Sequence, residues 1–237
     1  MKILAVSDVS NKGLEQIAEK SPGKLKKLDL IVSCGDLDKG YVELLVDGLN
    51  KDFYFVCGNH DHELVVEDEE EEKLWGDRPA CAVAGKYELH GKIEKYKNYY
   101  IVGFGGSLWY GGNGNEYREN EMAKIVKKTK RKLRWSQLKD KLAGRPKKDV
   151  IVISHAPIFG IHNLPDLTHT GFKCFADFLK KISPVLWIHG HVHLDDLHKN
   201  QVTVVGKTTV VNAYSHKYIN IDPKEIKISY SPVILDT

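Results

Sequence analysis

The sequence is poor in the features that mark secreted, disulfide-rich or membrane-spanning proteins. Its 237 residues include four scattered cysteines and form no CxxC pair. This excludes a dense disulfide framework and favours a reduced setting, where Cys34 and Cys57, which end apolar runs, would be small buried hydrophobes. No apolar run approaches the ~18 residues of a membrane-spanning helix, and the run after Met1 is too short for a signal peptide. We expect a cytoplasmic protein with no membrane partner.

Charge of one sign is also scarce, because the net charge is only +3. Bulk electrostatics therefore do not single out nucleic acid as a partner. Hydrophobic residues make up 42% of the chain and charged residues 28%, which is ordinary for a globular protein. Since no repeat or linker divides the sequence, we expect residues 1–237 to form a single domain. The oligomeric state is not readable from these features.

The first part of the chain alternates strand-like and helix-like segments. Apolar runs at residues 3–6, 28–33 and 53–57 enclose stretches with apolar residues at helical spacing. This order predicts a mostly parallel sheet covered by helices.

The middle and the end of the chain have a different pattern. Short, closely spaced strand candidates indicate an antiparallel region in the middle and a meander at the end; they span residues 80–84, 86–90, 92–96 and 99–104, then 201–205, 208–212, 216–221 and 226–229. Between these groups we expect helices at residues 121–142 and 171–182 and buried strands at residues 149–154 and 185–189.

Polar side chains with metal-binding chemistry follow several of these apolar runs: Asp8, Asp36, Asn59, His155, His191 and His193. Alone, most have an ordinary explanation, since Asp8 could cap a helix and Asp36 could fill a turn. A pair of histidines flanking one residue at a strand end has little structural use. Parallel strands deliver such residues to one crevice, and carboxylate, amide and imidazole ligands suit borderline divalent ions. The set predicts a metal site.

The ordered motifs resemble those of the calcineurin-like metallophosphoesterases, whose pattern is Asp-x-His, Gly-Asp, Gly-Asn-His-Asp/Glu, His and Gly-His-x-His. The matching segments are Asp8, Gly35-Asp36, Gly58-Asn59-His60-Asp61, His155 and Gly190-His191-Val192-His193. The resemblance implies an α/β fold (α+β in some schemes) of four α/β/β/α layers, a double β-sandwich flanked by helices. It also implies a phosphohydrolase that uses two divalent ions, Mn or Fe first and Zn, Ni or Mg as further candidates.

The resemblance also assigns roles to residues. It implies that Asp8 and His193 bind the first ion, that Asn59, His155 and His191 bind the second, and that Asp36 bridges both. His60 would be catalytic, assisting the leaving group of a phosphomonoester or phosphodiester, with Asp61 orienting it; Asn59 and His60 would also contact the substrate. A metal-bridging hydroxide would be the nucleophile.

One position departs from the family pattern. Ser10 stands where the Asp-x-His motif has histidine, and a serine hydroxyl is a poor ligand for such ions. We therefore expect the first metal site to bind its ion weakly.

Other features leave alternatives open. A basic stretch runs from Lys124 to Lys148; a solvated helix face explains it best, so a nuclease is a secondary hypothesis. A non-catalytic scaffold of the same fold is another. The turn at residues 103–107 lacks the Gly-Lys-Ser/Thr of a phosphate-binding loop, although Trp109, Tyr110 and Asn113 beyond it are candidate substrate contacts. We interpret the acidic residues 67–72 as a solvated segment.

Overall fold

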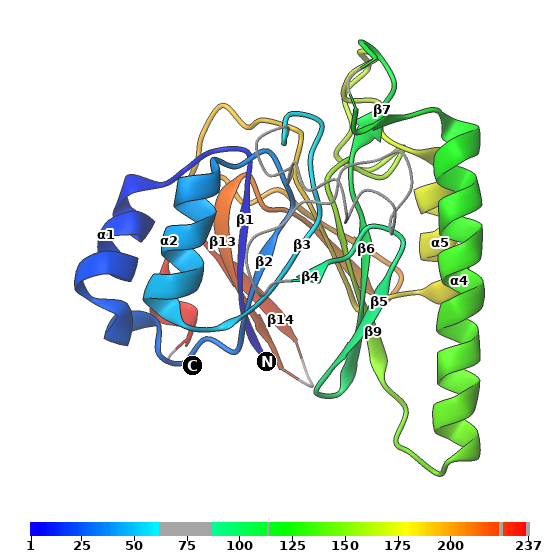
Figure 1. The fold of residues 1–237 in the computed structure, drawn as a ribbon, viewed down its shortest axis with the longest axis horizontal. Helices are drawn as coiled ribbons and strands as arrows, with labels where there is room; N and C mark the ends of the chain where they lie inside the picture. Colours follow the sequence, from blue (N-terminus) through cyan, green and yellow to red (C-terminus); the bar gives the residue numbers. More distant parts are fainter. Residues whose placement is uncertain (62–86, 113, 223–224, 236–237) are drawn as a thin grey trace, which may run out of the picture.

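The computed structural model describes residues 1–61, 87–112, 114–222 and 225–235. Two six-stranded sheets pack face to face, and helices cover the outer face of each (Figure 1). The layers are therefore α/β/β/α, as the family resemblance implied. Helices α1 and α2 lie on one side in Figure 1, and α4 and α5 lie on the other.

The first sheet has the strand order β14-β13-β1-β2-β3-β4. Strands β1, β2 and β3 are parallel, which confirms the interpretation of the N-terminal part, and β13 runs antiparallel beside β1. The elements of this half are β1 (Lys2–Ser7), α1 (Lys12–Lys20), η1 (Pro22–Leu25), β2 (Leu30–Ser33), α2 (Lys39–Leu49), β3 (Asp52–Phe55), β4 (Tyr87–Glu88), β13 (Ser215–Ile221), β14 (Ile226–Ser229) and η2 (Pro232–Leu235).

The second sheet has the order β11-β12-β10-β9-β6-β5. Its centre is parallel, because β9 pairs in parallel with both β6 and β10. The elements of this half are β5 (Ile93–Tyr96), β6 (Tyr99–Phe104), α4 (Glu119–Leu142), β9 (Asp149–Ser154), α5 (Lys173–Ile182), β10 (Leu186–His189), β11 (Val202–Val205) and β12 (Thr208–Asn212). A small ribbon of β7 (Ser107–Leu108) and β8 (Glu116–Tyr117) stands apart.

Two sequence expectations need correction. Among the described residues of the middle region, only β5 and β6 pair antiparallel, because β4 joins β3 in parallel and β6 joins β9 in parallel. The closing strands do not form one meander: β11 and β12 complete the second sheet, whereas β13 and β14 complete the first. The strand expected at residues 80–84 lies outside the described residues.

Three apolar clusters fill the spaces between the layers. One packs α1 and α2 on the first sheet, another packs α4 and α5 on the second, and the third lies between the sheets. The second cluster is aromatic: the Phe104, Phe175 and Phe178 rings surround Trp187, whose indole N–H donates to Ser154 Oγ at 2.9 Å. Burial on both faces explains why the central strands read as continuous apolar runs.

The cysteines and helices bear on two further expectations. Cys34 and Cys174 are buried free thiols, but Cys57 is disulfide-bonded, so the expectation of a free thiol at Cys57 is wrong. Among the described residues, no helix combines the length and apolar character that crossing a bilayer requires.

Candidate metal centre

The predicted ligands converge on one edge of the two packed sheets. Asp8, Asp36 and Asn59 follow β1, β2 and β3 of the first sheet, while His155 and His191 follow β9 and β10 of the second. The carboxyl ends of parallel strands share an edge, and here the edges of two sheets meet. The site therefore draws its donors from both halves of the fold.

Three motif glycines allow the strand-end turns to touch. A Cβ on Gly35 would lie 2.2 Å from the backbone nitrogen of Gly58, and one on Gly58 would lie 2.0 Å from Asp36 Oδ1. A Cβ on Gly190 would lie 1.9 Å from Ser7 Oγ. Because real Cβ atoms do not approach so closely, only glycine lets these backbones pack against the ligand-bearing turns.

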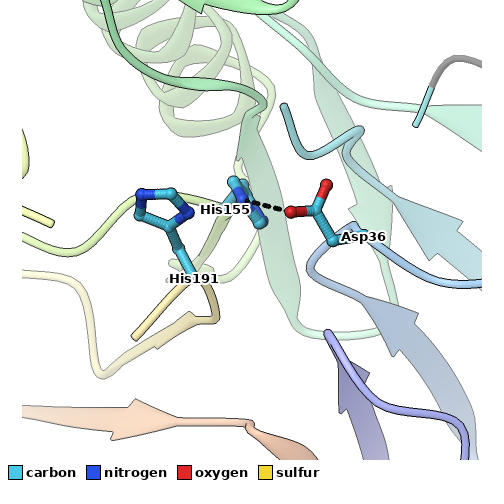
Figure 2. A group of neighbouring side chains, drawn as sticks. All are labelled: Asp36, His155 and His191. Carbon is cyan, nitrogen blue, oxygen red and sulfur yellow. Dashed lines mark ion pairs between the residues drawn. The ribbon is translucent and has the colours of Figure 1, made fainter. Parts of the chain in front are cut away.

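Asp36, His155 and His191 form a compact donor group. Each offers a ligand atom within 4.8 Å of the others (Figure 2). His155 Nε2 lies 3.3 Å from Asp36 Oδ2 and 2.8 Å from Asn59 Oδ1. The residues predicted to bind the second ion, Asn59, His155 and His191, thus lie together with Asp36, the predicted bridging carboxylate.

Backbone carbonyls orient the two histidines of this group. His155 Nδ1 donates to Cys34 O at 2.7 Å, which turns Nε2 toward Asp36. His191 Nε2 donates to Thr168 O at 2.9 Å, which leaves Nδ1 as the unprotonated nitrogen. A hydrogen bond from the second ring nitrogen to a carbonyl is the usual support of a metal-binding histidine.

The negative charge of Asp36 is balanced by a proton on His155. Burial opposes ionisation of both Asp36 and His155, but their mutual attraction prevails: the pKa of Asp36 falls to about 2 and that of His155 rises to about 9. Without a metal, the pair is a carboxylate facing an imidazolium. A cation at this position would take the place of that proton.

The predicted first site is more open. Both carboxylate oxygens of Asp8 accept the backbone N–H of His191 at 3.0 Å, while His193 Nε2 lies 3.9 Å from Asp8 Oδ1. Burial raises the pKa of Asp8, and the His193 side chain is 63% exposed. Ser10 is exposed. Asp8 and His193 therefore face each other with no imidazole at position 10.

Tyr214 is a neighbour of this open site that the sequence patterns did not single out. Its ring stacks on His193 with centroids 4.9 Å apart. Tyr214 directly precedes Ser215, which pairs with Ser7 beside Asp8. The strand register could have revealed this position, but only once the antiparallel pairing of β1 and β13 was known.

His60 and Asp61 occupy different environments. His60 is exposed, and its backbone N–H donates to Asp36 Oδ1 at 2.7 Å. Asp61 is buried and accepts backbone N–H groups from Gly58, Asp36 and Leu37 at 2.6 to 3.2 Å. Asp61 thus joins the Gly-Asp turn to the Gly-Asn-His-Asp turn. Its orienting role toward His60 stays a prediction.

Among the remaining candidate residues that the structure describes, Tyr110 contacts this centre. Asn59 Nδ2 donates to the Tyr110 hydroxyl at 2.9 Å, which places Tyr110 beside the second site. Trp109 is half-exposed, with the Arg118 guanidinium 4.8 Å from its ring centroid. Gly105 of the glycine-rich turn donates its N–H to His90 Nδ1 at 3.0 Å. Asn113 and the acidic residues 67–72 lie outside the described residues.

Two further histidines, His162 and His189, form hydrogen bonds at the carboxyl end of β10. His189 Nδ1 donates to Gly190 O at 2.9 Å, so its Nε2 accepts from His162 Nδ1 at 2.9 Å. His162 Nε2 then accepts from the Thr203 hydroxyl at 2.8 Å. Burial lowers the pKa of His162 to about 4 and that of His189 to about 3, so both rings are neutral. Sequence spacing gave no signal for this chain of hydrogen bonds.

The donor set fits the divalent ions that the fold family implies. Asp36, Asn59, His155 and His191 offer carboxylate, amide and imidazole atoms, and the compact group is held in place by backbone hydrogen bonds. These are ligands of Mn, Fe, Zn and Ni sites. The same chemistry at Asp8 and His193 offers fewer protein donors.

Comparisons with known proteins agree with this architecture. Among solved structures, the protein TT1561 of Thermus thermophilus matches with a TM-score of 0.62 at 15% identity, covering 96% of this chain and 97% of its own. A second crystal structure matches with a TM-score of 0.56 at 18% identity, covering 97% and 99%. Vps29 of Entamoeba histolytica is more distant, with a TM-score of 0.45 at 12% identity and coverage of 96% and 90%.

The sequence comparisons identify a family but no individual relative. No curated protein matches this sequence. The model of the calcineurin-like phosphoesterases, however, matches residues 1–195 and so includes every predicted ligand. The chain therefore belongs to the calcineurin-like phosphoesterase family.

Proposed function

We propose that this protein is a metal-dependent phosphohydrolase acting on phosphomonoesters or phosphodiesters. The observation that carries the proposal is the buried group of Asp36, His155 and His191 with Asn59 against His155. A cation exchanging for the proton of His155 would be held by four neutral or anionic donors in a preorganised arrangement. Mn and Fe are the ions we expect, with Zn, Ni and Mg as further candidates.

The chemistry divides between the ions and the side chains. Two divalent ions bound there would activate a water for attack on phosphorus. Asp36 would be shared by both ions, since Oδ1 and Oδ2 point to different partners, the His60 N–H and the His155 ring. Asn59 and Tyr110, joined by a hydrogen bond, line the same side and would contact the phosphate oxygens.

His60 is the side chain that we expect to protonate the leaving group. His60 is exposed and its backbone N–H donates to Asp36, so its imidazole would be free to reach the substrate beside the metal ligands. A positioned imidazole that protonates a departing alkoxide contributes ~10²–10⁴-fold to the rate.

The test is a screen of phosphomonoesters and phosphodiesters on Mn-supplemented protein, with metal analysis of each variant. We expect His60→Ala to lower kcat by ~10²–10⁴-fold with unchanged metal content. Asp36→Ala should lose both activity and metal. Loss of metal in His60→Ala would refute the leaving-group role.

A non-catalytic scaffold is the competing function, and the same screen separates the two. A scaffold would bind metal without turning over any ester, and His60→Ala would then change nothing that is measured. We favour the enzyme because His60 and the histidine pair are all present beside the compact donor group.

A further inference from the structure

We propose that the outer face of α4 binds the surface of an anionic membrane. We define the outer face by six residues that line or extend one hollow: Arg131, Lys132, Arg134, Trp135, Leu138 and Leu142. The proposal does not depend on the catalytic function, and it departs from the sequence expectation of no membrane partner, which rested on the lack of a spanning segment.

The first observation is a second apolar stripe on α4. The helix already buries one stripe, made of Met122, Val126, Thr129 and Leu133, against the second sheet and α5. On its opposite side, Trp135 is 58% exposed, Leu138 43% and Leu142 79%. At about 100° per residue, positions separated by three and seven residues share a face. Three large apolar side chains therefore line one exposed stripe.

A hollow accompanies the stripe. It has a volume of about 490 Å³ and is lined by Arg131, Lys132, Arg134, Trp135 and Leu138. The Lys139 ammonium lies 5.7 Å from the centroid of the Trp135 ring. Long basic side chains thus flank the apolar centre, and Arg131, Lys132 and Arg134 are exposed. Such side chains can cover apolar surface with their stems while their charged ends stay in water.

The second observation is the scarcity of compensating acids on this part of the helix. Residues 123–142 include nine lysines and arginines and a single acid, Asp140. Asp140 is buried and already engaged by Lys95 at 2.8 Å, Arg145 at 2.9 Å and the Tyr100 hydroxyl at 2.5 Å. The positive charge of the outer face therefore lacks an acidic partner within residues 123–142, and an anionic ligand would complement it.

The surroundings of the outer face are also positively charged. Partial burial and then the neighbouring cations Lys181 and Arg134 lower the pKa of Lys130, which lies elsewhere on the same helix, while Asp177 opposes this fall.

The combination of charge and apolar residues selects among partners. A second copy of the chain would set one basic face against another, which is unfavourable. The phosphates of a nucleic acid would pair with the basic side chains, and its nucleobases could stack on Trp135. A nucleic acid, however, has no apolar surface to cover Leu138 and Leu142. An anionic lipid surface accepts all of them, since tryptophan and leucine enter the headgroup boundary while lysine and arginine contact the lipid charges.

The experiment is sedimentation with vesicles of phosphatidylcholine alone or of equimolar phosphatidylcholine and phosphatidylglycerol. We expect the wild type to bind the anionic vesicles only, and less tightly at high salt. The double variant Leu138→Ser/Leu142→Ser keeps every lysine and arginine of the outer face. It should bind at least ~10-fold more weakly, because the apolar contribution to binding is lost. Val204→Ser is the matched control, since Val204 is 67% exposed on β11, and should bind like the wild type.

A charge variant and a nucleic-acid probe complete the test. Arg131→Glu/Lys132→Glu should also weaken vesicle binding. Circular dichroism checks folding, and all four substituted side chains are exposed. The proposal is overturned if the wild type ignores anionic vesicles, if Leu138→Ser/Leu142→Ser binds them as tightly as the wild type, or if the wild type binds only single-stranded DNA or RNA.

Discussion

At the scale of single residues, three aspartates of one centre have different acidities because their neighbours differ. Burial and the nearby Asp36 charge raise the pKa of Asp61 to about 6, although three backbone amides oppose this rise. Asp36 has a pKa of about 2 because His155 and the His60 N–H stabilise its charge. Burial raises the pKa of Asp8. The most readily ionised carboxylate is the one expected to bridge two cations.

The first testable prediction concerns Ser10. Replacing Ser10 with histidine should add an imidazole donor to Asp8, His193 and the shared Asp36, and a Ser10→Ala variant should behave like the wild type. Isothermal titration with Mn should show a tighter second binding event in Ser10→His, by ~10-fold or more for one added imidazole. Two equally tight ions in wild type and Ser10→His alike would contradict the predicted weakness of the first site.

Much of the candidate centre was predictable from residues in sequence order, because most of the candidate ligands come shortly after an apolar strand. The supporting residues were not. His162, Thr168 and Tyr214 come from loops whose positions depend on how the sheets pack, and no local spacing connects them to the ligands. Their roles arise from tertiary contacts alone.

At the scale of elements, the segment between β9 and α5 supports the β10 end. Through His162 it reaches His189, and through Thr168 it reaches His191. His162 adopts a positive φ of 61°, a strained conformation for a residue with a side chain. The strain is offset by hydrogen bonds at both ring nitrogens.

The second prediction follows from that chain of hydrogen bonds. His162→Phe removes the donor to buried His189 and the acceptor for half-buried Thr203, and a buried group without a partner costs ~1–3 kcal/mol. We expect urea denaturation to show a loss of that size, together with weaker metal binding. His198→Phe, at an exposed position, should change stability by less than ~0.5 kcal/mol. Equal stability of the two variants would contradict the role.

The same histidines predict a dependence on pH. Because burial lowers the pKa of His162 from 6.5 to about 4, the unfolded chain binds a proton that the folded chain refuses between these values. The stability that His162 contributes is present above pH 6.5 and is lost as the pH falls toward 4. His162→Phe should flatten this part of the pH profile.

Element type was easier to predict than pairing. The parallel β1-β2-β3 order and the long helix α4 follow from apolar periodicity, which is a local property. The division of β11–β12 and β13–β14 between two sheets is not local. The two strand pairs, β11–β12 and β13–β14, have the same short, alternating sequence pattern. The sequence therefore predicted one meander, whereas the two pairs lie at the edges of two different sheets.

At the scale of the whole molecule, a buried lysine lies among the strands that close the first sheet. Lys217 on β13 is fully buried, and its ammonium donates to Leu197 O and Tyr214 O at 3.2 and 3.3 Å. Burial lowers its pKa from 10.5 to about 8, although the charge of Asp196 opposes this fall. The folded protein therefore favours the neutral amine more than the unfolded chain does.

The fourth prediction states the consequence of this pKa for global stability. Between pH 8 and 10.5 the unfolded chain keeps a proton that folded Lys217 has lost, so this residue makes the free energy of unfolding rise with pH. Lys217→Met should lack the rise. Urea denaturation of both proteins across this range checks it, and a constant difference between them would show that Lys217 does not titrate abnormally.

The origin of the candidate ligands in two sheets has a mechanical consequence. Asp36 belongs to one half of the sandwich and His155 to the other, and their side chains are 3.3 Å apart. An ion bound by both side chains would cross-link the two halves of the fold. Because such an ion would bind the folded chain and not the unfolded one, it would stabilise the folded state by an amount that grows with the ion concentration. Separating the two sheets would then require release of the ion.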